Sequence, residues 1–315
     1  MSEVAAPVAW LSSLPALNVG QVKRDEPLAP WCSVRAGGNA QAWVKPQTPE
    51  QLIRLLKHME SGQVPLSILG GGANTLVGDG GVPGVTLKLP SDLFPEEVSG
   101  GDSEVLVTLC AGAAIARLLT VMKSNGLVGA EFLAGIPGTL GGAARMNAGT
   151  KNGECMTVVD ALELATPTGF GWLPQSGIAF RYRHTEIPTG SVVTRVRFRL
   201  RKGDLAESQA KIDADLGYRK RTQPLSQPNF GSVFTNPPGG FAGALIESVA
   251  LKGHRIGGAQ ISTQHANWIV NLGGAKAADI TALMDLAQAR VFEAKGVKLH
   301  PEVQRVGVFL PNTVE

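Results

Sequence analysis

Three short segments of the chain carry side chains suited to acid–base or charge-stabilising chemistry. Within them Arg183, Ser232 and Glu302 stand out. Each also has an ordinary interpretation, because an arginine can form a surface ion pair, a serine hydroxyl can bond in a turn and a glutamate can be solvated. Ser232 lies in no Gly-x-Ser-x-Gly elbow, the usual setting of a nucleophilic serine. In isolation, none of the three defines a reaction. The segments are residues 180–185, 231–237 and 301–303.

Residues 129–149 have the most unusual composition in the chain, with six glycines, one proline and no charge cluster. A core helix would not tolerate so many glycines, and a surface loop would be more polar. Gly135, Gly138, Gly141 and Gly142 lack a Cβ, so their N–H groups can reach an anion or lie against a flat ring system. A tight turn between buried strands would have the same composition, and composition alone does not choose between the two interpretations.

A second glycine-rich segment follows an apolar run at residues 64–69 and contains Gly70, Gly71 and Gly72, then Ala73, Asn74 and Thr75. A strand that leads into glycines predicts a loop whose N–H groups form an anion-binding nest. The segment is neither a Walker loop nor a Rossmann fingerprint. Two glycine loops that match neither motif indicate a long, phosphate-bearing cofactor held at two places.

Composition excludes several other classes of function. The chain has 315 residues, 43% hydrophobic and 17% charged, and a net charge of +3, which is too mild for a nucleic-acid partner but suits a small anionic substrate. Cys32, Cys110 and Cys155 are far apart, so we expect reduced, structural thiols and no metal site. No secretory signal and no apolar run of about 18 residues occurs, so we expect a cytoplasmic protein that does not bind membranes.

The helices and strands expected along the chain, which must position the residues named above, together indicate an α+β protein with no internal repeat. Thr48, Pro49 and Gln51 predict a capped helix start, and Arg195, Arg197 and Arg199 fall on what we expect to be a solvated strand face. We expect an N-terminal arm at 1–21, a domain at 22–200 divided near residue 90, and a second domain at 201–315. Strands are expected at 42–44, 64–69, 85–89, 104–110, 158–164, 192–201 and 303–310, and further helices near 113–124, 205–221 and 276–295.

In combination, these segments resemble the UDP-N-acetylenolpyruvoylglucosamine reductases, the flavoenzymes of cell-wall precursor synthesis. The resemblance spans residues 22–308 and implies a vanillyl-alcohol-oxidase-type FAD-binding fold of two subdomains (about 22–90 and 91–200), followed by a C-terminal α+β substrate-binding domain. Only residues 186–190 separate the motif that contains Arg183, residues 180–185, from the next strand, so the chain resembles the type without the tyrosine-loop insertion. The matching motifs are the two glycine loops and residues 35–38, 182–184, 231–234, 253–258, 265–271 and 301–303.

The resemblance implies NADPH-dependent reduction of UDP-N-acetylglucosamine enolpyruvate to UDP-N-acetylmuramate through non-covalently bound FAD, in peptidoglycan synthesis, and we expect a monomer. Arg183 would stabilise the negative charge that hydride addition creates, Glu302 would hold the carboxylate if protonated or hydrogen-bonded, and Ser232 would deliver the proton. The implied substrate contacts are Tyr182, Arg221 and Asn236. The implied FAD contacts are Arg35, Gly70, Gly71, Gly72, Ala73, Asn74, Thr75, Gly135, Ile136, Pro137, Gly138, Gly141, Gly142, Asn147 and Gly149.

Two positions depart from the usual pattern of the family, which often has a lysine at Thr235 and an arginine at Gln304. Either a lost cation weakens substrate binding, or Arg305 points away from the site as strand alternation predicts and another cation substitutes.

Two alternative functions remain open. A flavin oxidase of a small alcohol or sugar would commonly carry a histidine or cysteine for covalent attachment of the flavin, and residues 64–80 and 129–149 contain no histidine. A catalytically inactive nucleotide-binding or scaffold protein is supported only by Thr235 and Gln304.

Overall fold

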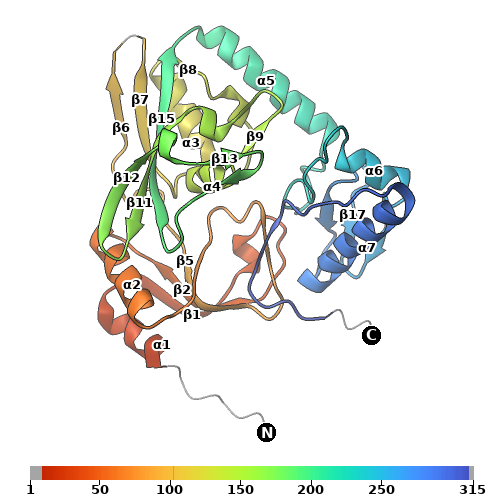
Figure 1. Ribbon diagram of the computed structural model, residues 1–315, viewed down its shortest axis with the longest axis horizontal. Coiled ribbons are helices and arrows are strands. Elements are labelled where there is room, and N and C mark those ends of the chain that lie inside the picture. Colours follow the sequence, from red (N-terminus) through yellow and green to blue (C-terminus); the bar gives the residue numbers. More distant parts are fainter. Residues whose placement is uncertain (1–8, 102, 312–315) are drawn as a thin grey trace.

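The computed structural model describes residues 9–101 and 103–311, which form an α+β protein as expected. Two sheets make up the part on the left of Figure 1, and a smaller part with three short strands lies on the right. Helix α5 (Leu205–Thr222) spans the two parts. Within the described ranges, no helix is long and apolar enough to cross a membrane.

The first sheet has the strand order β1-β2-β5-β3, and its parallel strands explain why its middle is buried. Strand β5 lies between β2 and β3 and only Pro83 of it is exposed. The alternation of Val85, Thr86 and Leu87 in sequence is typical of a half-buried strand, but β5 is buried on both faces. Helix α2 starts at the predicted cap, where Thr48 Oγ1 accepts from the amide of Gln51 at 3.3 Å. The Gln51 side chain accepts from Gln47 rather than from the cap residue itself. These elements are β1 (Gln21–Pro27), β2 (Asn39–Lys45), α2 (Pro49–Ser61), β3 (Leu66–Ile68) and β5 (Val82–Leu87).

The second sheet has the order β12-β11-β15-β7-β6, with β8 beside one end of β15. The inner side chains of β15 are buried, as the alternation predicted, but its arginines are not simply solvated. Arg195 donates to Glu163 through Nε at 2.9 Å and Nη2 at 2.7 Å, and Arg197 donates to Asp160 at 2.6 Å. The outer face is therefore an ion-paired layer. These strands are β6 (Glu97–Gly100), β7 (Val105–Cys110), β8 (Leu127–Val128), β11 (Val159–Thr166), β12 (Gly169–Pro174) and β15 (Val192–Lys202).

The C-terminal part packs α6 (Ala242–Ser248) and α7 (Ala277–Lys295) beside the sheet β16-β17-β18. Helix α7 ends at Gly296, whose φ of 68° is the left-handed conformation that favours glycine at this position. The last strand, β19 (Gln304–Val306), is shorter than the strand expected at 303–310. It pairs in parallel with β4 (Thr75–Val77) of the first part. The other strands here are β16 (Arg255–Ile256), β17 (Ala259–Ile261) and β18 (Ile269–Asn271).

Several contacts tie the ends of the chain to the body. Leu14 and Val19, which fall in the segment expected to be an arm, are fully buried, whereas residues 1–8 lie outside the described residues. The Asp79 carboxylate accepts from the first two amides of α7 at 2.8 Å each, which joins the C-terminal part to the turn between β4 and β5. The remaining elements are α1 (Ala9–Ser13), α3 (Ile115–Ser124), α4 (Leu140–Arg145), β9 (Gly149–Thr150), β10 (Gly153–Glu154), β13 (Phe180–Arg181) and β14 (His184–Thr185).

All three cysteines are buried and unpaired, as expected of structural thiols. Burial raises the pKa of Cys32 to about 11 and that of Cys155 to about 12, so these thiols stay protonated near neutral pH.

Candidate active site

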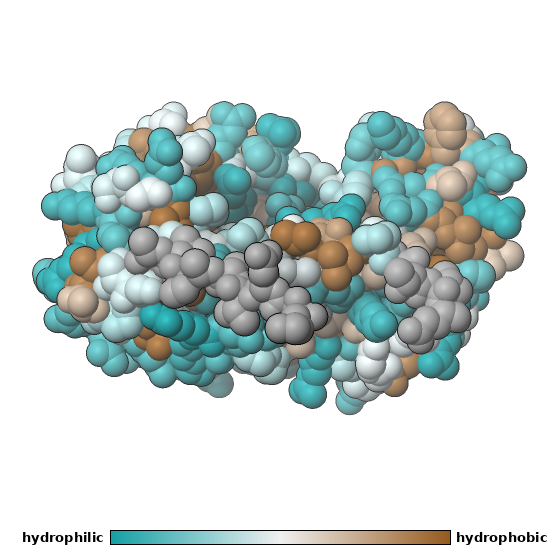
Figure 2. Space-filling view, turned by 90° about the horizontal axis from the view of Figure 1, so that it is seen from below, coloured by the Kyte–Doolittle hydropathy of each residue, from teal (hydrophilic) through white to brown (hydrophobic). Residues whose placement is uncertain are grey.

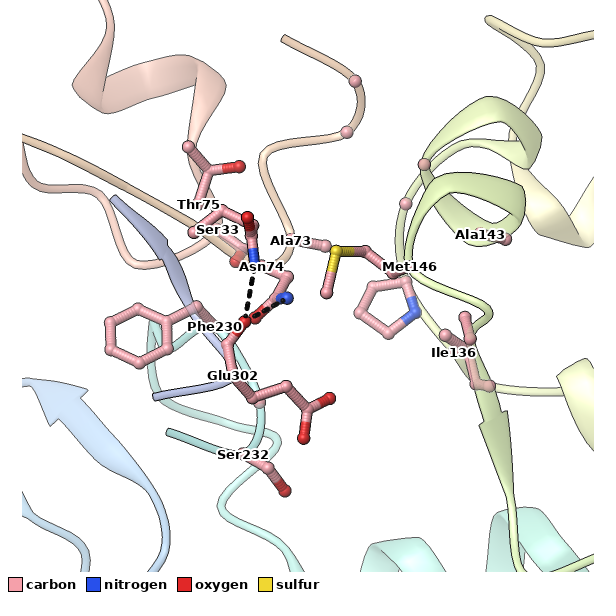
Figure 3. A pocket seen from close by; sticks show the side chains of 18 of the residues that line it. Ser33, Ala73, Asn74, Thr75, Ile136, Ala143, Met146, Phe230, Ser232 and Glu302 are labelled. Atoms are coloured by element: carbon pink, nitrogen blue, oxygen red, sulfur yellow. Dashed lines mark hydrogen bonds between the residues drawn. The ribbon is translucent and has the colours of Figure 1, made fainter. Parts of the chain in front are cut away.

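A cavity of about 1530 Å³ lies where the two glycine loops meet the C-terminal part. Figure 2 shows a notch between the two parts of the molecule, and Figure 3 shows the pocket from close by. Arg183, Ser232 and Glu302, which lie far apart in the sequence, all line this cavity. Every predicted FAD contact except Asn147 lines it as well.

Residues 70–75, which we call the phosphate loop, present unbonded backbone donors. In the described part of the chain, the amides of residues 70–74 donate to no backbone acceptor. Gly72 has a φ of +62°, and a Cβ there would lie 2.1 Å from the Trp31 carbonyl oxygen, so only glycine fits. The Lys88 ammonium donates to the Gly70 carbonyl oxygen from behind the loop. These features match an anion-binding nest.

Residues 135–142, the second glycine loop, use most of their amides within the protein. Leu140 and Gly141 donate to the carbonyls of Ala113 and Ala111, at 2.9 and 2.8 Å. A Cβ on Gly71 would lie only 2.5 Å from Gly138 Cα, so the two loops touch each other. Part of the glycine content therefore serves contact between two backbones, which is neither the contact with a ligand nor the tight turn between buried strands that composition had left open.

Arg183 and Glu302 form an ion pair at the cavity, with 3.1 Å between Nε and Oε1. Strands β13 and β14 form a hairpin whose turn holds Arg183 at a φ of +59°. Its Nη2 donates to the Gly149 carbonyl oxygen at 2.9 Å, whereas its Nη1 is buried and has no hydrogen-bond partner among the residues that the structure describes. A buried, unpartnered guanidinium N–H in a cavity indicates an acceptor supplied by a ligand.

The Glu302 carboxyl is mostly buried, with 15% of its side chain exposed. Burial raises the pKa of Glu302, and the neighbouring Arg183 guanidinium offsets part of this effect. The backbone of Glu302 donates to the Val233 carbonyl oxygen at 2.8 Å, which places it beside the segment that carries Ser232.

Ser232 is followed directly by Val233 and Phe234, which Asn267 holds through three hydrogen bonds. The Asn267 side chain accepts from the Phe234 amide at 3.0 Å and donates to its carbonyl oxygen at 2.8 Å. Its own carbonyl accepts from the Val233 amide at 2.9 Å. In Figure 3 the Ser232 hydroxyl and the Glu302 carboxyl both face the space opposite Ile136 and Met146.

Comparison with known proteins identifies the family of this chain and the reaction that it catalyses. The chain is 62% identical to the UDP-N-acetylenolpyruvoylglucosamine reductase of Myxococcus xanthus. The alignment covers 98% of this chain and 100% of that protein. The chain belongs to the UDP-N-acetylenolpyruvoylglucosamine reductase family. It is an FAD-containing oxidoreductase of peptidoglycan synthesis that reduces UDP-N-acetylglucosamine enolpyruvate with NADPH as co-substrate. Family membership decides against the alternative oxidase and against the inactive scaffold.

Other relatives of the reductase agree. The C-terminal domain of the UDP-N-acetylenolpyruvoylglucosamine reductases matches residues 223–306, and an FAD binding domain matches residues 40–170. The reductase of Anaeromyxobacter sp. strain Fw109-5 is 52% identical over 97% of this chain and 95% of its own length. The crystal structure of the reductase from Thermus caldophilus superposes with a TM-score of 0.79 at 34% identity, over 91% of this chain and 99% of that one.

Three of the residues predicted to belong to the site of the reductase lie outside the cavity lining. Asn147 is fully buried and donates to Glu154 at 2.8 Å and to the Arg181 carbonyl oxygen at 3.1 Å, so it supports the hairpin that carries Arg183. Tyr182 is 47% exposed and stacks over the Arg183 guanidinium, 4.6 Å from ring centroid to Cζ. Arg221 also lies outside the lining.

Arg219 lines the cavity in place of Arg221. Residues two apart on a helix point in nearly opposite directions, about 200° apart, so only one of the two arginines can face the site. Residues 219–221 are three consecutive basic residues, and the sequence alone does not say which of them faces inward.

Asn236, an expected substrate contact, lines the cavity, and its side chain also accepts from the first amide of α6 at 3.0 Å. Thr235 lies outside the lining, whereas Gln304 is part of it. The Arg305 guanidinium stacks over Phe309 at 4.1 Å and lies outside the lining, as strand alternation suggested. The predicted alternative, in which Arg305 points away from the site, therefore describes this structure.

Sequence reasoning missed several residues that contribute to the site. Ser33 and Arg145 line the cavity, and the buried Asn267 holds the Ser232 segment. Asn267 lies within the matching motif at 265–271, which was the one signal that could have identified it. Ser33 and Arg145 carry no local signal, because their roles depend on contacts with residues distant in the sequence.

Proposed function

We propose that Arg183, Glu302 and Ser232 carry the reduction of the enolpyruvyl sugar nucleotide in the common cavity. The single observation that supports this assignment most strongly is the Arg183–Glu302 ion pair, in which one guanidinium nitrogen, Nη1, is buried without a partner within residues 9–101 and 103–311. The carboxylate of the substrate would supply the missing acceptor. Arg183 comes from the larger part of the molecule, and Glu302 and Ser232 come from the C-terminal part, so the arrangement exists only in the folded chain.

FAD would lie along both glycine loops and, when bound, supplies the hydride that is added to the terminal alkene carbon of the substrate. The residues present fit this group. The phosphate loop offers amides at residues 70–74 that donate to no backbone acceptor among the described residues, and these would bind the pyrophosphate. The close contact between Gly71 and Gly138 keeps both loops on one wall of the cavity.

Arg183 would stabilise the charge that develops on the substrate carboxylate when hydride is added. The guanidinium is already oriented by Glu302 and by the Gly149 carbonyl, so it needs little reorganisation when the charge forms. Pre-oriented donors of this kind are worth several kcal/mol in a site that excludes water.

Glu302 would bind the same carboxylate in its protonated form. An ionised Glu302 would repel the substrate, but burial raises its pKa, which favours uptake of a proton when a second negative charge enters. The protonated carboxyl could then donate a hydrogen bond while Arg183 keeps its charge.

Ser232 would deliver the proton to the carbon next to the carboxylate. A hydroxyl is a weak acid, so it can serve only where the carbon is strongly basic. Asn267 keeps the Ser232 segment in place, and no protein hydrogen bond engages the Ser232 hydroxyl in the described residues. The hydroxyl therefore remains available to the substrate.

The test separates the two half-reactions by following flavin absorbance anaerobically in wild type and Ser232→Ala. Both proteins should be bleached by NADPH at similar rates, because Ser232 takes no part in flavin reduction. Reoxidation by the enolpyruvyl substrate should be about 10²- to 10⁴-fold slower in the variant. Normal reoxidation of Ser232→Ala would remove the serine from the proposed mechanism.

We further propose that the enzyme acts as a cytoplasmic monomer, with the FAD-binding domain at 22–200 and the substrate domain at 201–315. The support for a monomer is that one chain supplies every group named above. Light scattering of the purified protein at micromolar concentration should give the mass of a single chain, and a mass twice as large would refute this.

A further inference from the structure

The phosphate loop holds the backbone of Glu302 as well as facing the cavity. The Asn74 side-chain amide donates to the Glu302 carbonyl oxygen at 3.1 Å, and the Asn74 carbonyl accepts from the Gln304 amide at 2.9 Å. Asn74 and Glu302 are 228 positions apart in sequence. Figure 3 shows the Asn74 side chain beside Glu302, with the hydrogen bond between them drawn as a dashed line.

The pairing continues beyond Asn74. Its neighbour Thr75 begins β4, which runs parallel to β19 with Thr75 opposite Gln304. On its other side, Glu302 donates to the Val233 carbonyl oxygen at 2.8 Å. The backbone of Glu302 is thus fixed between the phosphate loop and the Ser232 segment, and the position of its carboxyl opposite Arg183 depends on both contacts.

A second link joins the same loop to the C-terminal part. The Ser33 hydroxyl lies 3.2 Å from the Gly72 carbonyl oxygen and 2.5 Å from that of Asn229, three residues before Ser232. Ser33 therefore links the loop to the segment that carries Ser232, and Asn74 links the loop to Glu302.

We propose that Asn74 is a positioning residue for Glu302, through which FAD binding at the phosphate loop is coupled to the placement of the Glu302 carboxyl. The coupling rests on the role proposed above for Glu302. A phosphate bound by the amides of residues 70–74 would fix the backbone on which Asn74 lies, and Asn74 would in turn fix the Glu302 strand. Coupling of this kind is reciprocal, so an ordered Glu302 strand also favours FAD binding.

The first test compares Asn74→Ala with wild type in the two half-reactions. Alanine removes the side-chain donor without adding charge near the phosphates. FAD should bind more weakly, as the reciprocal coupling requires, but at saturating FAD the bound flavin should be reduced by NADPH within about 2-fold of the wild-type rate. Reoxidation by the enolpyruvyl substrate should be about 10-fold slower, the effect expected for one lost hydrogen bond that orients a reacting group. Equal slowing of both half-reactions would overturn the proposal.

Asn125→Ala is the matched control. The Asn125 side chain also donates to a backbone carbonyl, that of Val121 at 2.8 Å, and Asn125 lies outside the cavity lining. It should leave both half-reactions unchanged. A similar loss in this control would mean that general destabilisation explains the Asn74→Ala result.

A double-mutant cycle with Glu302→Gln tests whether Asn74 acts through Glu302. If it does, Asn74→Ala should slow reoxidation by less than about 2-fold in the Glu302→Gln background, because the group that it positions is already altered. A slowing of the same factor in both backgrounds would refute the assignment.

Amide hydrogen exchange of residues 300–306 gives a readout that does not depend on activity. FAD should slow exchange of this segment in wild type and in Asn125→Ala, and this slowing should be lost in Asn74→Ala although FAD still binds. An FAD effect that is absent in wild type, or unchanged in Asn74→Ala, would overturn the coupling. If Glu302→Gln instead reoxidises normally, the proposed role of Glu302 fails, and the exchange data still decide whether loop and strand are coupled.

Discussion

The two glycine-rich segments each hold one partner of the Arg183–Glu302 ion pair, but they do so with different chemistry. The phosphate loop holds Glu302 through Asn74 and leaves the amides of residues 70–74 without backbone acceptors. The segment 129–149 holds Arg183 through the Gly149 carbonyl and spends most of its amides on bonds within the protein. Similar compositions therefore serve two purposes.

The difference teaches what glycine contributes at each place. In the phosphate loop, Gly72 needs a positive φ beneath the Trp31 carbonyl, so that the chain turns and its donors remain exposed. In the second segment, Gly138 lies so close to Gly71 that the two backbones touch. A glycine-rich segment thus predicts close approach, but not whether a ligand or the protein itself makes the approach.

Among the variants that test this difference between the two glycine-rich segments, we expect the largest effect from Arg183→Lys. A lysine cannot reach Glu302, the Gly149 carbonyl and the substrate together, because it lacks the planar fork of donors. Reoxidation of the flavin by substrate should fall about 10²- to 10³-fold, with FAD binding unchanged. Stopped-flow absorbance measures the rate, and flavin fluorescence titration serves as the control. A variant that loses FAD as well would show that the second segment supports the cofactor through Arg183.

A smaller effect is expected for Gly71→Ala, which tests the contact between the loops. The new Cβ would lie 2.5 Å from Gly138 Cα, and the backbones must separate to admit it. Overpacking of this kind costs about 1–3 kcal/mol, so FAD should bind about 10- to 100-fold more weakly. Fluorescence titration of the flavin measures the affinity.

Gly171→Ala is the control for that experiment, because a Cβ at Gly171 meets nothing within 4 Å. Its FAD affinity should match that of wild type. If Gly71→Ala also binds FAD normally, the close contact between the two loops is not needed for the cofactor site.

The smallest effect concerns the pH dependence that Glu302 gives to stability. Since burial raises its folded-state pKa above the ordinary value of 4.5, the folded protein binds more protons than the unfolded chain at pH values between the two. The free energy of unfolding of wild type relative to Glu302→Gln should therefore fall as pH rises through this window. Urea unfolding of both proteins with saturating FAD measures it, and a difference that rises with pH would contradict the raised pKa.

Much of the local structure was predictable because it depends on short-range patterns. The cap at Thr48, the buried face of α7 and its end at Gly296 follow from side-chain chemistry and helical period. The parallel position of β5 was missed, because whether a strand is covered on one face or both depends on its neighbours in the sheet.

The sequence by itself determined which residues could do chemistry, since their types and order already matched a reductase site. Only the tertiary structure decided how they are used. It buried Asn147 beneath the hairpin, turned Arg219 rather than Arg221 toward the cavity, and brought Asn74 to Glu302. The physical reason is that helical rotation and contacts between distant segments are set by packing of the whole chain, which no local pattern of residues encodes.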